Sequence, residues 1–307
     1  MHKNNGNLRF GLCCIFRKEP ITFRQITAKT LQPLSRAEQL SRLSDICLHN
    51  INSVIHSLHF AADNGIGAFR ILSPLFPRYT HPEVCYRIDE LPAGDIIREQ
   101  CSKIRNFRRS RDIRLSFHPD QFNVLASPKI HVINNTIREL KYHGMLADLL
   151  DADIINLHVG GAYGDKEAAL SRLQNNVAKL PDNVTKRLSL ENDDISYTPA
   201  DLLPVCEKLK IPMVYDVHHH RCLPDGLSEE EITGRVVALW ERIGKEPYFH
   251  ISSPKNGWQS SSPKPHADFI DPADFPTCWE ELTATVDVEA KAKELAVLKL
   301  KNDLGLM

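Results

Sequence analysis

Eight short apolar segments recur along the chain, and segments with helical periodicity separate most of them. The segments that predict strands span residues 8–14, 68–72, 113–118, 153–159, 187–192, 212–217, 248–252 and 284–289. The segments that predict helices, with Leu, Ile, Val and Ala at helical spacing, span residues 35–65, 128–151, 164–180, 198–210, 228–244 and 289–305. Because strands that alternate with helices form parallel sheets, this order predicts an α/β fold, a (β/α)8 or TIM barrel.

The 307 residues contain no Pro/Gly-rich linker that would divide them. TIM barrels often reach this length as one unit. We therefore expect a single domain over residues 1–307, with residues 1–7 as a flexible N-terminus. The longest predicted helix has recognisable ends, since Ser35 and Glu38 form a capping-box pattern and Gly65 follows the last turn.

Composition restricts the classes of partner. The net charge of −1 provides no global field toward nucleic acid or an anionic membrane, so any anionic partner must be bound by a local patch. The eight cysteines show no CxxC spacing and no disulfide-framework pattern, which is typical of reduced thiols in the cytoplasm. The N-terminus lacks the apolar core of a signal peptide, and no apolar run approaches a membrane span. We expect a cytoplasmic, soluble protein without a membrane partner.

Imidazole and carboxylate side chains stand at or just beyond the C-terminal ends of six predicted strands. In a (β/α)8 barrel these ends face one mouth, where active sites lie. The candidate donors are His118, His158, Glu191, Asp216, His219, His250, His266 and Glu289. One such histidine alone would indicate a hydrogen-bonded core residue, and Glu289 alone a charge at a helix start. Their shared position favours a common metal site at the C-terminal face of the strands.

The donor types indicate the metal and the chemistry. Imidazole and carboxylate without thiolate favour Zn²⁺, Mn²⁺ or a related first-row ion over Ca²⁺ or an iron–sulfur cluster. Eight donors exceed the needs of one tetrahedral ion, so we expect a cluster of two or three divalent ions that share Glu191 as a bridge, and no organic cofactor. Such clusters catalyse phosphoester cleavage. The candidate catalytic residues are Glu191, His118 and His219.

Several segments resemble the UV damage endonucleases, a family of DNA repair enzymes similar to endonuclease IV in fold and metal site. The matching segments are LRFGL (8–12), SFHPDQFNVL (116–125), INLHVGGAYGDK (155–166), LSLENDD (188–194), YDVHHH (215–220), HISSPK (250–255), HADFID (266–271) and DVEAKAKELAVLKL (287–300). They occur in the family's order and span nearly the whole chain. HPDQF, LENDD and HISSPK together are specific to the family.

The resemblance implies an enzyme that nicks damaged double-stranded DNA immediately 5′ to cyclobutane pyrimidine dimers and 6-4 photoproducts. The nick leaves a 3′-hydroxyl and a 5′-phosphate. The resemblance also implies that the same eight donors bind metal, that manganese is favoured over zinc or magnesium, and that the protein is a monomer. The family's pair of residues that enters DNA at the lesion falls on Gln121 and Phe122. Tyrosine is common at the second place, and Phe122 keeps its stacking face.

Two positions depart from the family pattern. Some members carry a carboxylated lysine two residues before the histidine that matches His250, and here that place holds Tyr248, which cannot form a carbamate. The metal cluster is then held differently, or the lysine is dispensable. Near the end of the first strand some relatives have a polar residue close to DNA, and Leu12 and Cys13 cannot take that role.

Further residues near the predicted mouth have open or minor roles. Arg70 contacts either a DNA phosphate or a neighbouring metal ligand, and Lys255 contacts phosphate or is a solvated loop residue. Trp258 is a candidate to stack on bases. His218 and His220 flank a candidate ligand and are expected to be loop residues.

Three other functions remain open from the sequence. An endonuclease IV-like enzyme would act at abasic sites with the same kind of barrel. A sugar isomerase or epimerase would also bind divalent metal at strand ends, although the HPDQF loop and the eight donors argue against it. A barrel that binds damaged DNA without cutting it would follow if Tyr248 weakens the metal cluster.

Overall fold

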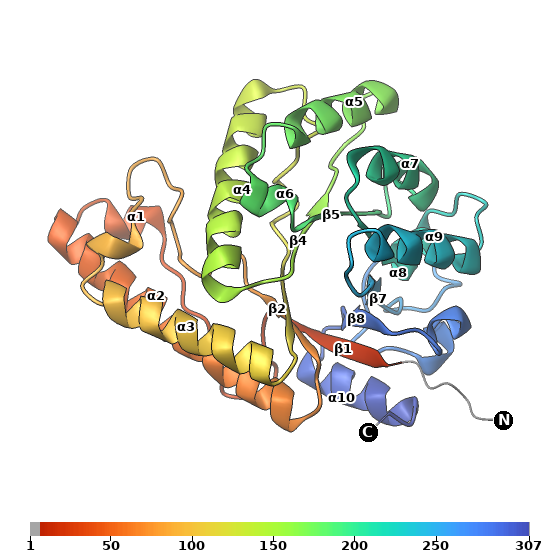
Figure 1. Ribbon diagram of the computed structural model, residues 1–307, viewed down its shortest axis with the longest axis horizontal. Helices are drawn as coiled ribbons and strands as arrows, with labels where there is room; N and C mark the ends of the chain where they lie inside the picture. The colour runs from red at the N-terminus through yellow and green to blue at the C-terminus, as the bar shows by residue number, and fades with distance from the viewer. Residues whose placement is uncertain (1–6, 307) are drawn as a thin grey trace.

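The computed structural model describes residues 7–306, and its eight parallel strands close into one barrel (Figure 1). The strands are β1 (Leu8–Cys13), β2 (Ala68–Ile71), β3 (Arg114–Phe117), β4 (Ile154–His158), β5 (Leu188–Glu191), β6 (Met213–Asp216), β7 (Tyr248–Ile251) and β8 (Ala284–Val288). Each strand pairs with the next along the chain, and β8 pairs with β1. The predicted TIM barrel is confirmed, with every strand boundary within one residue of the predicted one. The expectation for residues 1–7 lies outside the described residues, apart from Asn7.

Helices surround the strands (Figure 1). The α-helices are α1 (Ala28–Leu31), α2 (Arg36–Asp63), α3 (Gly94–Ser110), α4 (Ile130–Leu150), α5 (Lys166–Val177), α6 (Asp182–Thr185), α7 (Pro199–Leu209), α8 (Val217–Cys222), α9 (Glu229–Glu241) and α10 (Glu294–Asp303). Short 3-10 turns are η1 (Ile88–Glu90), η2 (Pro272–Asp274) and η3 (Thr277–Trp279). None of the described helices is long and apolar enough to cross a membrane.

The helix pattern departs from the prediction at helix α3, at the start of helix α10 and at the short helices α1, α6 and α8. Helix α3 was not predicted, because its buried apolar stripe is narrow and arginines occupy much of the rest of the helix. The last helix begins at Glu294 rather than at Glu289, so Glu289 lies in the turn that follows β8. Between β7 and β8, where no helix was predicted, the described chain contains only the turns η2 and η3. The predicted ends of α2 are confirmed, since Ser35 and Glu38 form a complete capping box.

The interior of the barrel is polar. TIM-barrel interiors are ordinarily filled by layers of Val, Ile and Leu. Here inward-facing side chains hydrogen-bond across the interior, as in the pairs Arg114–Thr285 at 2.8 Å, Ser116–Tyr248 at 3.3 Å, Asn156–Ser189 at 2.9 Å and Tyr248–Asp287 at 2.8 Å. Apolar residues alternate with them along each strand and pack outward, as Phe69 and Ile71 do on either side of Arg70. A column of polar groups therefore leads to the mouth of the barrel.

Gly11 makes room for this polar interior. A Cβ atom at Gly11 would lie 1.8 Å from Oδ1 of Asp287, its register partner on β8. We predict that Gly11→Ala lowers the free energy of unfolding by about 1–3 kcal/mol, because the added methyl group overpacks the interior. Urea unfolding followed by circular dichroism measures this change.

The matched control is Gly234→Ala on helix α9, where an added Cβ would meet no atom within 4 Å. That substitution should raise the free energy of unfolding by about 0.5–1 kcal/mol, since alanine is the better helix former. Equal stability of the two variants would contradict the packing around Gly11.

Candidate metal centre

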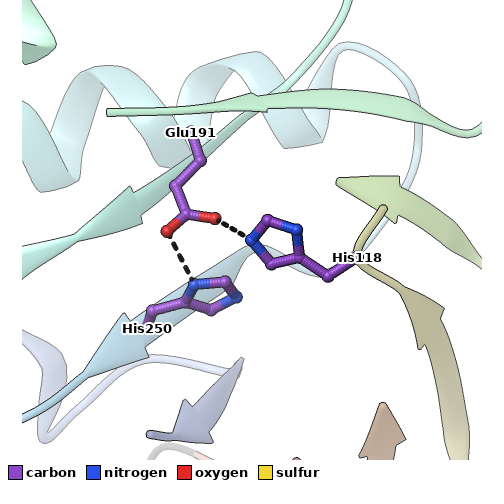
Figure 2. A group of neighbouring side chains, drawn as sticks. All are labelled: His118, Glu191 and His250. Carbon is purple, nitrogen blue, oxygen red and sulfur yellow. Dashed lines mark hydrogen bonds and ion pairs between the residues drawn. The ribbon is translucent and has the colours of Figure 1, made fainter. Parts of the chain in front are cut away.

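Glu191 lies at the centre of a group of histidines at the C-terminal mouth of the barrel. It ends β5 and is fully buried. Figure 2 shows its carboxylate between two imidazoles: Oε2 lies 2.9 Å from Nε2 of His118, and Oε1 lies 3.1 Å from Nδ1 of His250. His219 Nδ1 is 3.5 Å and His158 Nε2 is 3.9 Å from Oε1. Four histidines therefore converge on one carboxylate. His118 follows β3, His158 ends β4, His250 lies in β7 and His219 lies in α8.

The remaining predicted donors extend this group. Asp216 Oδ2 lies 3.5 Å from Nδ1 of His219, and Glu289 Oε1 lies 3.4 Å from Nδ1 of His250. His266 Nδ1 is 3.9 Å from Glu289 Oε2, at the edge of the group. The structure thus brings all eight predicted donors together.

Six of the eight form three overlapping groups in which the donor atoms lie within 4.8 Å of one another. These groups are His118–Glu191–His250, Glu191–Asp216–His219 and Asp216–His250–Glu289. His158 and His266 stand outside these triplets, next to Glu191 and Glu289 respectively. Overlapping groups with shared carboxylates can hold more than one cation.

Local structure explains how Asp216 and His219 reach the site. Asp216 ends β6 and is the N-cap of α8, since its Oδ1 accepts a hydrogen bond from the backbone N–H of His219 at 2.8 Å. Its other oxygen, Oδ2, remains free to face the site. Asn192 fixes the end of β5 to the end of β6, because its amide bonds both backbone groups of Asp216 at 2.8 and 2.9 Å.

Two histidines of the centre also lie close to backbone carbonyls. His118 Nδ1 lies 3.2 Å from the carbonyl of Pro119, and His219 Nδ1 lies 3.0 Å from the carbonyl of Asn192. When Nδ1–H donates to a carbonyl, Nε2 of the neutral ring carries a lone pair. In that tautomer the lone pair of His118 Nε2 would face Glu191 Oε2 at 2.9 Å, which needs a cation between the two atoms, whereas in the other tautomer Nε2–H donates to the carboxylate.

Buried atoms without hydrogen-bond partners concentrate at this centre. Six such side-chain atoms occur within residues 7–306, and four belong to the predicted donors. They are His158 Nδ1, Glu191 Oε1, Asp216 Oδ2 and His250 Nδ1. Each buried unpaired polar atom costs about 1–3 kcal/mol. A bound cation would satisfy Glu191 Oε1 and Asp216 Oδ2, so these residues fit a metal centre.

The charged side chains at the centre shift one another's pKa values. Burial alone would raise the pKa of Glu191, but His250, His158 and His118 hold that pKa well below its usual range. Burial likewise opposes ionisation of Glu289, yet Arg70 and His250 lower its pKa. Although burial lowers the pKa of His219, the carboxylates of Asp216, Glu191 and Glu289 raise it to about 9. Glu191 and Glu289 therefore stay ionised and attract positive charge.

Asn156, which the sequence did not single out, orients Glu191. Asn156 donates to Glu191 Oε2 and accepts a hydrogen bond from Ser189 at 2.9 Å. It lies two residues before His158, so the period-two alternation of β4 was the signal that could have placed it on the same face. Tyr248, at the place of the family's lysine, donates from its hydroxyl to Asp287 Oδ1 at 2.8 Å.

Arg70 lies inside the barrel rather than at its surface. Its side chain is 9% exposed, and its Nη1 lies 2.6 Å from Glu289 Oε1. Nη2 lies 2.8 Å from His250 Nε2. Of the two roles left open by the sequence, these contacts favour the contact with a neighbouring candidate ligand, and they argue against a direct contact with DNA.

The predicted DNA-probing residues stand on an exposed turn beside the centre. Two hydrogen bonds to Asp120 fix the turn. The backbone N–H of Phe122 donates to Asp120 Oδ1 at 2.9 Å, and the backbone N–H of Asn123 donates to the carbonyl of Asp120 at 2.8 Å. Phe122 is 77% exposed, the most exposed of the large hydrophobic side chains in the described chain. Gln121 is also exposed. An exposed aromatic ring on a fixed turn is suited to contact a partner.

A hollow of about 420 Å³ lies between this turn and the metal centre. Its walls include Gln121, Phe122, His158, Ile195 and His219. Ile195 is 73% exposed, so apolar side chains flank both sides of a space that reaches two candidate ligands.

The other candidates on the rim are placed less centrally. Lys255 is exposed and contributes its backbone N–H to the carbonyl of Pro265. Trp258 is half-buried, donates from Nε1 to Asp274 at 2.7 Å and packs 5.2 Å from the ring of His218. The expectation that His218 and His220 are loop residues is wrong. Both are buried in helix α8, and His220 links Tyr215 to Asp225.

The chain resembles known proteins over nearly its whole length. Residues 8–307 match the family model described as UV-endonuclease UvdE. A UV DNA damage endonuclease from Bacillus velezensis is 35% identical over 317 aligned residues, covering 97% of this chain and 94% of that protein. The crystal structure of SacUVDE superposes with a TM-score of 0.85 at 28% identity, covering 98% of this chain and 100% of that one. These matches confirm the resemblance that the motifs indicated.

Endonuclease IV from Thermus thermophilus shares the fold. Its crystal structure superposes with a TM-score of 0.59 at 15% identity, with 97% of each chain covered. The expected likeness in fold is confirmed, and at this identity the likeness concerns the barrel alone.

Binding of a divalent ion to this centre should stabilise the fold. At a manganese concentration about 100-fold above the dissociation constant, binding to the folded state adds about 2.7 kcal/mol to the free energy of unfolding. We predict a gain of that order when chelator-treated protein is unfolded by urea with and without manganese. Glu191→Gln should lose most of the gain, and Glu99→Gln on the outer helix α3 should keep it. No gain in the unaltered protein would contradict a metal centre.

Proposed function

Since the chain belongs to the UvdE family of UV endonucleases, we propose that it is a metal-dependent DNA repair endonuclease that incises DNA immediately 5′ to UV photoproducts. The products of this incision are a 3′-hydroxyl and a 5′-phosphate, and the lesions are cyclobutane pyrimidine dimers and 6-4 photoproducts. The observation that carries the proposal is the convergence of eight imidazole and carboxylate donors at the barrel mouth, with unpaired buried atoms among them.

The proposed metal ligands are the eight side chains of the centre. They are His118, His158, Glu191, Asp216, His219, His250, His266 and Glu289. The donor chemistry suits two or three divalent ions, with manganese favoured and zinc or magnesium as alternatives. When bound, such ions act as Lewis acids that activate water and stabilise charge on phosphoester oxygens.

The chain's own residues hold the catalytic carboxylate in place. His118 and Asn156 both contact Glu191 Oε2, so this oxygen has a fixed direction. His219 is oriented by the carbonyl of Asn192, which lies 3.0 Å from its Nδ1. We assign the catalytic roles to Glu191, His118 and His219, because Glu191 is fully buried and both partly exposed histidines are held beside it.

The exposed turn and the hollow beside it support a role in recognising damaged duplex DNA. In the proposed complex Gln121 and Phe122 enter the duplex at the lesion, and the damaged dinucleotide rotates toward the hollow that borders His158 and His219. A damaged step costs less to unstack, so selectivity arises without reading the base sequence. Lys255 and Trp258 lie on the rim as further candidate DNA contacts. The proposed enzyme acts as a monomer in the cytoplasm.

A set of three duplexes tests the proposal directly. They share one sequence and carry a cyclobutane dimer, an abasic analogue or no damage, each incubated with and without manganese. The proposal predicts a nick immediately 5′ to the dimer that requires metal. Preference for the abasic duplex would indicate an endonuclease IV-like enzyme, and tight binding of the dimer without a nick would indicate a binding protein. Failure to bind or cut any duplex would overturn the nuclease assignment.

Replacement of the central carboxylate should separate cutting from binding. We predict that Glu191→Gln lowers the nicking rate by roughly 10³-fold, about 4 kcal/mol of transition-state stabilisation. Affinity for the damaged duplex should change by less than about threefold, because Glu191 is fully buried and contacts no surface. Single-turnover nicking and fluorescence anisotropy measure the two effects. Undiminished cutting by this variant would count against the scheme.

Loss of the probing side chains should affect discrimination instead. Stacking of one base on an aromatic ring is worth about 1–3 kcal/mol, so Gln121→Ala with Phe122→Ala should reduce the preference for damaged over undamaged duplex by about 5- to 150-fold. The control is Ile96→Ala, which removes an exposed apolar side chain from helix α3. Unchanged preference in the double variant, measured by competition nicking, would refute the proposed insertion.

A further inference from the structure

A buried chain of polar contacts runs from Tyr248 to the metal centre. We infer that Tyr248 and Asp287 are positioning residues: they hold Arg70 so that its guanidinium fixes Glu289. The inference rests on the proposed function, because it concerns how the same centre binds divalent ions. Neither Tyr248 nor Asp287 is among the eight proposed ligands.

The contacts form a continuous path. The Tyr248 hydroxyl donates to Asp287 Oδ1 at 2.8 Å. Asp287 Oδ2 accepts from Arg70 Nε at 3.0 Å and lies 2.9 Å from its Nη2. Arg70 Nη1 then reaches Glu289 Oε1 at 2.6 Å, and Nη2 lies 2.8 Å from His250 Nε2. Both carboxylate oxygens of Asp287 accept hydrogen bonds, Oδ1 from Tyr248 and Oδ2 from Arg70. The contacts therefore connect Tyr248, Asp287, Arg70 and Glu289 in that order.

Burial makes this path rigid. Asp287 is fully buried, Tyr248 is 1% exposed and Arg70 is 7% exposed. A buried carboxylate is stable only when it is paired and hydrogen-bonded. A guanidinium stays charged and presents its donors in a fixed planar fork, so the position of Asp287 decides where the fork points. Arg70 therefore cannot turn away from Glu289 without breaking its bonds to Asp287.

The barrel is shaped to accept this carboxylate. Gly11 is the register partner of Asp287, and any larger residue there would collide with Oδ1. The Ser116 hydroxyl lies 3.3 Å from the Tyr248 hydroxyl. An apolar residue at position 287 would be the ordinary filling of a TIM-barrel interior. Here the space beside Gly11, together with the hydroxyl groups of Ser116 and Tyr248, suits the charged side chain of Asp287, which contacts Arg70.

The equilibrium affinity for manganese tests the role without depending on catalysis. Tyr248→Phe removes one hydroxyl and keeps the ring, so Asp287 Oδ1 loses its hydrogen bond from Tyr248 while the interior stays filled. Partners that orient metal ligands typically contribute about 10- to 100-fold to metal affinity. We expect Tyr248→Phe to weaken manganese binding by about tenfold and Asp287→Asn, which also removes the charge opposite Arg70, by about 100-fold. Titration followed by the electron paramagnetic resonance signal of free Mn²⁺ measures both.

Tyr86→Phe is the matched control. Tyr86 is also buried, and the hydrogen-bond partners of its hydroxyl, the carbonyl of Pro77 at 2.9 Å and Sγ of Cys47 at 3.1 Å, do not belong to the centre. The same atom is deleted, so a loss of general stability should appear in Tyr86→Phe and Tyr248→Phe alike. Only Tyr248→Phe should lose manganese affinity. An equal loss of affinity in both variants would show a structural effect and overturn the positioning role.

The outcomes separate this inference from the proposed function. Manganese affinity in Tyr248→Phe equal to that of the unaltered protein would overturn the inference, even if the unaltered protein nicks irradiated DNA. Absence of manganese binding in the unaltered protein would overturn the proposed metal dependence and the inference together. If Asp287→Asn does not fold, Tyr248→Phe decides alone.

Discussion

The close approach of several donors to the buried Glu191 carboxylate is the interaction on which the centre depends. Four imidazoles lie within 3.9 Å of its oxygens, and two further carboxylates stand nearby. In water such groups would separate, but here they are fixed at the ends of hydrogen-bonded strands and in the turns that follow them. The barrel supplies the rigidity that keeps them together, and a bound divalent cation is the partner that would satisfy them.

The polar interior extends this constraint below the mouth. Buried charges need partners, so a carboxylate-rich site cannot rest on a purely apolar layer. Arg70 balances Asp287 and Glu289, and Asn156 supports Glu191. The interior hydrogen bonds thus serve the geometry of the site, while the apolar faces of the strands and the surrounding helices form the core.

Sequence periodicity was sufficient for the barrel and for the eight donors, because parallel strands in a closed barrel carry their C-terminal ends to one mouth. It was not sufficient for side chains whose role depends on packing across the barrel. Arg70 could be placed near the mouth, but its burial follows from Asp287, which lies 217 residues away in the chain. His218 and His220 look like loop residues in a run of three histidines, yet a short helix buries them. Helix α3 escaped prediction because its apolar stripe is narrow.

Anomalous diffraction at the manganese edge, from crystals grown with manganese, tests the central claim most directly. The account predicts at least two peaks among the eight donors, with Glu191 between neighbouring ions. A map with no peak among these side chains, at a manganese concentration that supports nicking, would contradict it.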